Sequence, residues 1–173
     1  MNETKQKILD VSLDLFSQKG FSAVSIRDIC KSVGIKESSV YYHFKNKQSI
    51  FNELLQRFET TATDLMCQLE QGVNALPDAS GENLYGKTCG CFFENYLMDE
   101  YCNKMLRLLS IEHLHNDEMR KIYDYWLFDK PLNFQGKVFS VLSMSGMIQT
   151  EDSSYLAVKF YAPIFLFMQR WLF

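Results

Sequence analysis

The sequence predicts an all-α fold with two domains, a three-helix domain over residues 1–47 and a larger helical domain over residues 48–173. Apolar residues recur at three- and four-residue steps along most of the chain, which is the period of an amphipathic helix. No segment shows the apolar–polar alternation typical of a strand. Hydrophobic residues make up 47% of the chain, which is enough to form a packed interior.

The first predicted helix covers residues 4–19. Ile8, Val11 and Leu15 lie on one face of this helix because they are three or four positions apart. Gly20 follows directly, and a glycine after a basic last turn is typical of a helix C-terminus.

Two shorter helices complete the predicted N-terminal domain. Ser25 precedes the second helix and has Asp28 three positions later, which resembles a capping box although Asp is not its usual member. Gly34 ends this helix with a residue that turns at little steric cost. The third helix is expected over residues 36–44, with Val40 facing the core.

The larger domain begins with a long predicted helix from Gln48 to Leu69 or beyond. Residues 72–86 hold a proline, glycines and small polar residues, and they are expected to form a loop. Further helices are predicted over residues 85–98, 103–115, 117–128, 132–147 and 154–173, with a polar turn and N-cap at 151–153.

The charge is unevenly distributed between the two predicted domains. Residues 1–47 carry eight Lys/Arg and five Asp/Glu, whereas the remainder carries ten and sixteen, within a net charge of -3. A basic head on an acidic body predicts an anionic partner at one end of the molecule only.

Several classes of protein are disfavoured by what the sequence contains. The N-terminus is polar, and the most apolar run, residues 160–168, is about half of the length that a bilayer span needs. We therefore expect a soluble, cytoplasmic protein with no membrane partner. Five cysteines are an odd number at irregular spacing, which favours reduced thiols.

No pattern indicates a catalytic residue, a cofactor or a metal ion. Neither a nucleophile elbow nor a phosphate-binding glycine loop is present, so the sequence does not favour an enzyme. Cys89 and Cys91 lie two positions apart, as do His113 and His115, and such pairs point away from each other on a helix. Redox sensing by the scattered thiols stays an open alternative.

The two short helices joined by a glycine turn, with a supporting helix in front, have the layout of a helix-turn-helix module. In such modules the second helix enters the major groove of DNA and the first braces it across the backbone. The open side of the third predicted helix supplies groups that hydrogen-bond to bases or phosphates, flanked by Lys45 and Lys47.

This segment resembles the signature of the TetR family of transcription regulators over residues 7–55, without a gap. The matching residues are Gly20-Phe21, Val24-Ser25-Ile26-Arg27-Asp28-Ile29-Cys30, Val33-Gly34-Ile35, Ser39-Val40-Tyr41-Tyr42-His43-Phe44 and Lys47. Cys30 departs from the alanine that is usual in the family, although both residues are small and apolar. Beyond about residue 60 the likeness extends only to the general helical layout.

The resemblance implies roles for individual residues. Positions that usually contact phosphates are Ser25, Tyr41, His43 and Lys47, and positions that usually face bases or the groove edge are Arg27, Glu37, Ser38, Ser39 and Tyr42; Lys36 is expected in either role. Glu37 has a second interpretation as a solvated acid at the helix start, and Tyr41 as a core residue with its hydroxyl at the surface.

The larger domain is expected, by the same resemblance, to bind an effector and to dimerise. The predicted pocket residues are Met66, Phe92, Tyr96, Met105, Leu109, His113 and Tyr123, although such residues at helical spacing are more often plain core. The predicted dimer contacts, on the unusually apolar last two helices, are Phe134, Val138, Val141, Leu142, Leu156, Phe160, Ile164, Phe165 and Met168.

The resulting hypothesis is a homodimer that binds a palindromic operator in double-stranded DNA and represses transcription until a small-molecule effector releases it. One helix-turn-helix makes too few contacts for specificity, so two copies are expected. The alternative is a regulator or adaptor whose C-terminal body binds a protein partner.

Overall fold

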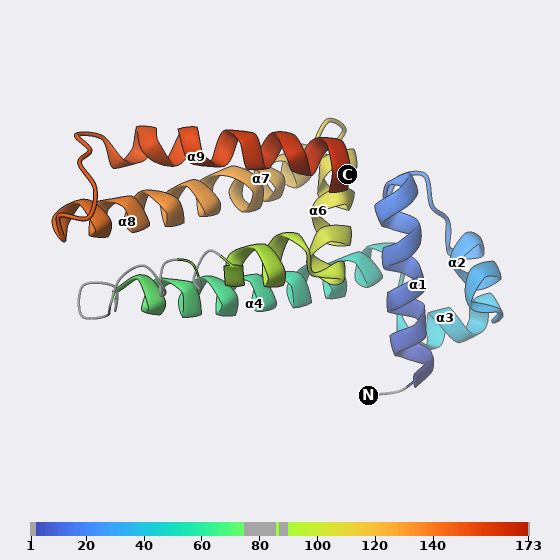
Figure 1. The fold of residues 1–173 in the computed structure, drawn as a ribbon. Helices are drawn as coiled ribbons and strands as arrows, with labels where there is room; N and C mark the ends of the chain where they lie inside the picture. The colour runs from blue at the N-terminus through green and yellow to red at the C-terminus, as the bar shows by residue number, and fades with distance from the viewer. Residues whose placement is uncertain (1–2, 75–85, 87–89, 173) are drawn as a thin grey trace. The chain divides into compact units, whose positions relative to one another are not determined.

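The computed structural model describes residues 3–74, 86 and 90–172, and every regular element in these ranges is a helix (Figure 1), which confirms the all-α prediction. The chain divides into two compact units. The first comprises Met1–Thr60 and Lys104–Ile122, and the second comprises Thr61–Asn103 and Tyr123–Phe173. A segment from the middle of the chain is therefore part of the N-terminal unit. Within the described ranges, no helix is both long and apolar enough to cross a membrane.

The first unit contains the three predicted N-terminal helices. They are α1 (Glu3–Lys19), α2 (Ile26–Val33) and α3 (Glu37–His43), followed by the beginning of α4 (Lys47–Asn74). Most of α6 (Glu100–Glu112) and of α7 (Asp117–Asp124) also belongs to this unit. The core of the three-helix part consists of fully buried side chains, among them Ile8, Phe16, Ile29, Val40, Ile50 and Phe51.

The start of α2 is the capping box that the sequence predicts. The Ser25 side chain accepts a hydrogen bond from the Asp28 backbone N–H, and the Asp28 carboxylate accepts one from the Ser25 backbone N–H. Two of the backbone donors that a helix N-terminus leaves free are thereby satisfied. The aspartate thus performs the part that glutamate more often takes.

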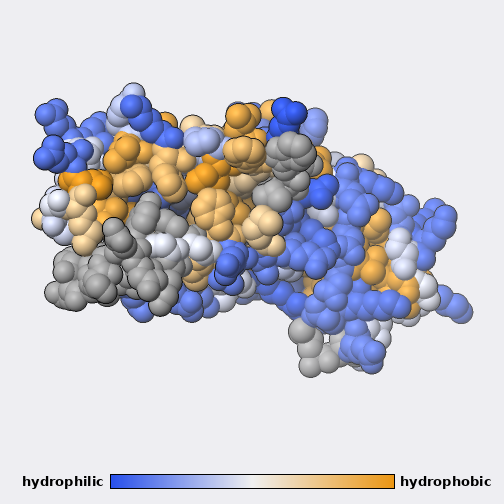
Figure 2. Space-filling view, viewed as in Figure 1, coloured by the Kyte–Doolittle hydropathy of each residue, from blue (hydrophilic) through white to orange (hydrophobic). Residues whose placement is uncertain are grey.

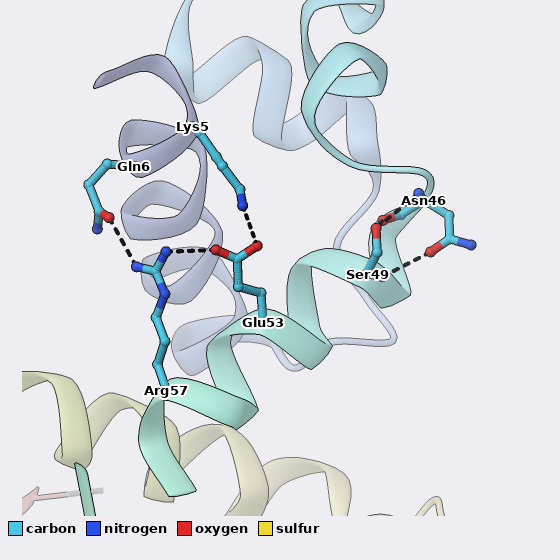
Figure 3. A network of polar contacts seen from close by, with 6 residues as sticks. All are labelled: Lys5, Gln6, Asn46, Ser49, Glu53 and Arg57. Carbon is cyan, nitrogen blue, oxygen red and sulfur yellow. Dashed lines mark hydrogen bonds and ion pairs between the residues drawn. The ribbon is translucent and has the colours of Figure 1, made fainter. Parts of the chain in front are cut away.

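A polar network fastens α1 to α4 (Figure 3). The Glu53 carboxylate on α4 accepts from the Lys5 ammonium at 2.7 Å and from the Arg57 guanidinium at 2.7 Å. Arg57 also donates to the Gln6 side chain on α1 at 3.0 Å. Burial would raise the pKa of Glu53, but the hydrogen bonds and charges of Lys5 and Arg57 outweigh it and lower the pKa below its ordinary value of 4.5.

The second unit is formed by the rest of α4 and the C-terminal helices. These are η2 (Phe93–Leu97), η3 (Tyr125–Asp129), α8 (Lys130–Met144), α9 (Ser153–Phe167) and η4 (Met168–Leu172), where η marks a π-helical turn. Helices α8 and α9 lie side by side (Figure 1), and the Phe139 and Phe160 rings meet edge to face at 5.7 Å. The predicted N-cap is present, because the Asp152 side chain accepts from the Tyr155 backbone N–H.

Some predicted boundaries are wrong. Residues 72–74 of the expected loop belong to helix α4, which ends at Asn74. Of the other residues of this loop, the structure describes only Gly86, which is helical. The last helix does not continue uniformly to the end, because it changes to a π-helical turn at Met168. The change of helix type at Tyr125, inside the predicted helix over 117–128, was also not anticipated.

Four of the nine predicted dimer contacts are buried by the chain itself. Phe134, Val138, Leu142 and Met168 expose less than a tenth of their surface in a single copy, so they are core residues that a second copy cannot reach. The Phe134 ring stacks on Phe92 with ring centroids 6.1 Å apart, and α8 packs against α9. Val141, Leu156, Phe160, Ile164 and Phe165 are partly exposed.

Replacing Glu53 by Gln should lower the free energy of unfolding at pH 7 by about 1 kcal/mol, because two charged hydrogen bonds between α1 and α4 are weakened. A carboxyl group whose pKa is lowered by folding stabilises the fold above its ordinary pKa, and this contribution disappears as the pH falls through the folded-state value. The difference from the wild type should therefore narrow between pH 7 and pH 3 in urea unfolding curves.

Glu59→Gln is the matched control, because Glu59 is exposed on the same helix. It should change stability by less than about 0.5 kcal/mol at either pH. Equal losses in the two variants would show that the network in Figure 3 contributes nothing specific.

Candidate nucleic-acid interface

The turn between α2 and α3 depends on a glycine. Gly34 has a φ of +80°, in the left-handed region that side chains disfavour, and nothing lies near the place where its Cβ would be. The Gly34 and Ile35 backbone N–H groups both donate to the Cys30 carbonyl, at 2.9 and 3.1 Å, which ends α2. Helix α3 then begins after Lys36 in a new direction.

One face of α3 is open to solvent. Tyr42 is 82% exposed and Tyr41 is 52% exposed, whereas Val40 is completely buried. The tyrosine exposures contradict the alternative that Tyr41 is mainly a core residue. Ser25, Arg27, Lys36 and Ser38 are exposed, while Glu37, Ser39, His43 and Lys47 are partly exposed. All ten predicted DNA contacts therefore present some surface, and the assignment of each to a base or a phosphate stays a prediction.

Arg27 and Glu37 are paired with each other across the two short helices. The Arg27 Nε atom donates to the Glu37 carboxylate at 3.1 Å, and both side chains are substantially exposed. Exposed ion pairs of this kind contribute little to stability. The pair nevertheless involves two of the charged side chains that were predicted to face bases or the groove edge.

Ser25 serves as the N-cap of α2 and also lies at the surface. Its side-chain and backbone hydrogen bonds lower the pKa of the Asp28 carboxyl, with smaller contributions from Lys19 and Lys31. A phosphate approaching the start of α2 would meet backbone N–H groups and the positive end of the helix dipole. The Asp28 carboxylate at the same end opposes that attraction.

Lys47 lies at the beginning of α4 and turns back to the α1–α2 turn. Its ammonium donates to the Phe21 and Val24 carbonyls, each at 2.7 Å, and lies 4.2 Å from the centre of the Phe21 ring. Burial lowers the pKa of Lys47, partly opposed by the nearby charge of Glu112. Two of its three N–H donors are thus used inside the protein, which the sequence did not indicate.

The thiol at the unusual position in α2 is not a reactive one. Cys30 is buried, and burial together with the charge of Glu37 raises its pKa, which disfavours the nucleophilic thiolate. Burial also raises the pKa of Cys102 to about 12. Among the described residues, no group of three or more His, Cys, Asp or Glu side chains is arranged to hold a metal ion.

The predicted effector-pocket residues are divided between the two units. Met66, Phe92, Tyr96 and Tyr123 belong to the second unit, whereas Met105, Leu109 and His113 belong to the first. Within the second unit, Phe92 lines a narrow apolar crevice and Met66 lines a more open groove, and Phe134 lines both. All of the predicted pocket residues except His113 are buried.

The fold and the exposed helix define a class of protein, the helix-turn-helix DNA-binding proteins. Helix α1 supports α2, and α2 is joined to an exposed recognition helix α3 by a glycine turn. Residues 8–54 match the profile of the family described as bacterial regulatory proteins, tetR family. Over these residues the chain is similar to the N-terminal DNA-binding domain of TetR-family regulators.

Similar sequences are named as regulators of transcription. The HTH-type transcriptional regulator AcrR of Shigella flexneri is 43% identical over 63 residues, which are 36% of this chain and 29% of that protein. The negative transcriptional regulator IcaR of the icaADBC biofilm operon of Staphylococcus aureus is 49% identical over 49 residues, 28% and 26% of the two chains. The matched region thus spans less than a third of these relatives.

Solved structures of transcription regulators have a similar helical fold over most of this chain. A transcriptional regulator from Aquifex aeolicus covers 97% of this chain and 86% of its own, with a TM-score of 0.60 and 20% identity. A TetR-family regulator from Mesorhizobium loti covers 91% and 77%, with a TM-score of 0.59 and 23% identity. Both are named as transcriptional regulators.

Lys47→Ala should lower the free energy of unfolding by about 2 kcal/mol, because two carbonyls of the α1–α2 turn lose a charged donor. Lys45→Ala, at an exposed lysine two positions earlier, should change it by less than about 0.5 kcal/mol. Thermal and urea unfolding of both variants measure the difference. An unchanged stability for Lys47→Ala would mean that its contacts with the turn are unimportant.

Proposed function

We propose that this protein is a sequence-specific DNA-binding transcription regulator that acts in the cytoplasm as a homodimer, and that it represses transcription until an effector binds. The exposed polar and aromatic face of α3 is the observation that carries this proposal. A helix of this kind fits the major groove, and tyrosine, serine and lysine side chains hydrogen-bond to base edges and phosphates. The TetR-type N-terminal domain supports the same function.

A homodimer is favoured by an exposed apolar stripe on α9. Tyr155, Val158, Ala162 and Leu166 follow one another at intervals of three or four residues and are all exposed. Figure 2 shows apolar side chains at the surface of the second unit, on the part of it that holds α8 and α9 in Figure 1. A second copy would cover this stripe by pairing the same helix with itself. Two recognition helices could then read a palindromic operator.

An apolar effector is the kind that the second unit favours. Phe92, Phe134, Phe160 and Ile164 line a narrow crevice together with Tyr161, which is almost completely buried. The Tyr161 hydroxyl has no hydrogen-bond partner among the described residues. An aromatic or aliphatic compound with one polar group would satisfy that hydroxyl while its apolar part replaces contacts between side chains.

Selection from a random duplex pool tests the DNA-binding function. The wild type should enrich one palindrome, and Tyr42→Ala should weaken binding to it by about tenfold or more, because one good base contact is worth about 1–3 kcal/mol. Binding should weaken steeply with salt, as expected of contacts with phosphates. The readout is the dissociation constant at several salt concentrations.

Tyr125→Ala is the matched control, because Tyr125 is an exposed tyrosine of the second unit. It should bind the selected duplex as the wild type does. A wild type that enriches no sequence, or a Tyr42→Ala variant with unchanged affinity, would overturn the proposed use of α3.

Leu166→Glu tests the proposed dimer. Leu166 is 66% exposed on the α9 stripe, so a charge there should leave the fold intact but shift sedimentation from dimer to monomer at micromolar concentration. Leu114→Glu places the same charge at a leucine of similar exposure in the first unit and should stay dimeric. A monomeric wild type, or equal sedimentation of the two variants, would rule out this interface.

A further inference from the structure

A buried carboxylate outside the helix-turn-helix binds the turn between α1 and α2. Glu112 is the last residue of α6 and only 4% exposed, and it belongs to the same unit as α1, α2 and α3. We propose that Glu112 is a positioning residue for DNA binding, which fixes the start of α2 through the α1–α2 turn. This inference rests on the proposed function and adds a residue that no sequence motif identifies.

The contact between Glu112 and the turn is a two-point hydrogen bond. The Ser22 backbone N–H donates to Oε1 at 3.1 Å, and the Ser22 hydroxyl donates to Oε2 at 2.7 Å. Charge-assisted bonds of this kind are stronger than neutral ones, and two of them fix an orientation as well as a distance. Ninety residues separate the partners in the sequence, so the contact is purely tertiary.

The turn is held from two sides. Lys47 of α4 donates to the carbonyls of Phe21 and Val24, which flank Ser22 and Ala23, while Glu112 of α6 accepts from Ser22 itself. The next residue after Val24 is Ser25, the N-cap of α2. A displacement of the α1–α2 turn would therefore move the start of α2. Helix α3 packs against α2, so it would move as well.

Gly20 shows how closely the carboxylate approaches the turn. An added Cβ at this position would lie 2.5 Å from the Glu112 Oε1 atom and 2.9 Å from the Ile111 Cγ2 atom. Its φ of +85° also favours glycine. The end of α6 thus lies against the bare backbone of the turn, with no space for a side chain between them.

The choice of a charged residue at this buried place supports a positioning role. Burying a carboxylate is costly unless it is hydrogen-bonded and close to an opposite charge, and here Ser22 supplies the bonds and Lys47 the charge. An apolar residue would avoid the cost but would allow the turn to slide. Directional bonds allow a single placement of Ser22.

A second contact between α6 and α1 provides a control. Lys104, near the start of α6, forms an ion pair with Asp14 of α1 and does not involve the turn. Asp14→Ala should therefore weaken the packing of α6 on α1 while leaving Ser22 in place. Exposed pairs of this type contribute about 0.2–1 kcal/mol.

The experiment compares Glu112→Ala, Glu112→Gln, Ser22→Ala and Asp14→Ala in the full chain. Two quantities are measured: the hydrogen-exchange rate of the Ser22 amide without DNA, and the affinity for the duplex that the wild type selects. Glu112→Ala should speed exchange at Ser22 and weaken binding about tenfold. Glutamine can accept from the amide and donate to the hydroxyl, so Glu112→Gln should stay within about twofold of the wild type.

Ser22→Ala removes only the hydroxyl bond and should weaken binding about threefold, and Asp14→Ala should leave affinity unchanged. If Glu112→Ala fails to fold, the affinities of Ser22→Ala and Glu112→Gln for the selected duplex test the positioning role instead. Wild-type affinity in Ser22→Ala, and in Glu112→Ala where that variant folds, would overturn the positioning role. A loss in Asp14→Ala as large as in Ser22→Ala would also overturn it. A wild type that selects no duplex would instead overturn the proposed function, and this inference with it.

Discussion

The shape of the N-terminal unit depends on how the backbone of one turn satisfies its hydrogen bonds. Within the turn between α1 and α2, the Val24 backbone N–H donates to the Phe21 carbonyl only at 3.4 Å, and buried polar groups without good partners are costly. The Lys47 ammonium supplies two donors to the carbonyls of Phe21 and Val24. The Phe21 ring lies next to the Lys47 ammonium and between two other rings. Its centroid is 5.4 Å from that of Phe16 and 5.3 Å from that of Phe51. Polar and apolar contacts together therefore determine where α2 begins.

The sequence predicted the elements of this unit well because their signals are local. The Ser25–Asp28 cap and the left-handed Gly34 act within three or four residues, and both are found where the pattern indicated. The direction of the Lys47 side chain could not be predicted in the same way. A lysine at the start of a helix ordinarily extends into solvent, and only the folded chain brings carbonyls 23 and 26 residues earlier within its reach.

Prediction was weaker in the second unit because apolar spacing identifies a buried face but not the element that covers it. Phe134, Val138 and Leu142 were expected to meet a second copy, yet they are buried within the chain itself. The stripe that includes Tyr155 and Leu166 was missed because its exposure depends on which side of α9 faces α8. The predicted pocket residues are divided between the two units, and the site that they would form stays a prediction.

The pairing of Arg27 with Glu37 affects how the recognition surface responds to ionic strength. The Arg27 Nε atom lies 3.1 Å from the Glu37 carboxylate, so the negative charge of Glu37 offsets part of the positive charge that Arg27 presents to a polyanion. Added salt screens the attraction between Arg27 and Glu37 as well as the attraction between Arg27 and the polyanion. The binding of Arg27 to DNA would therefore release less than one counterion. A count of basic residues would thus overstate how steeply the affinity for DNA falls with salt.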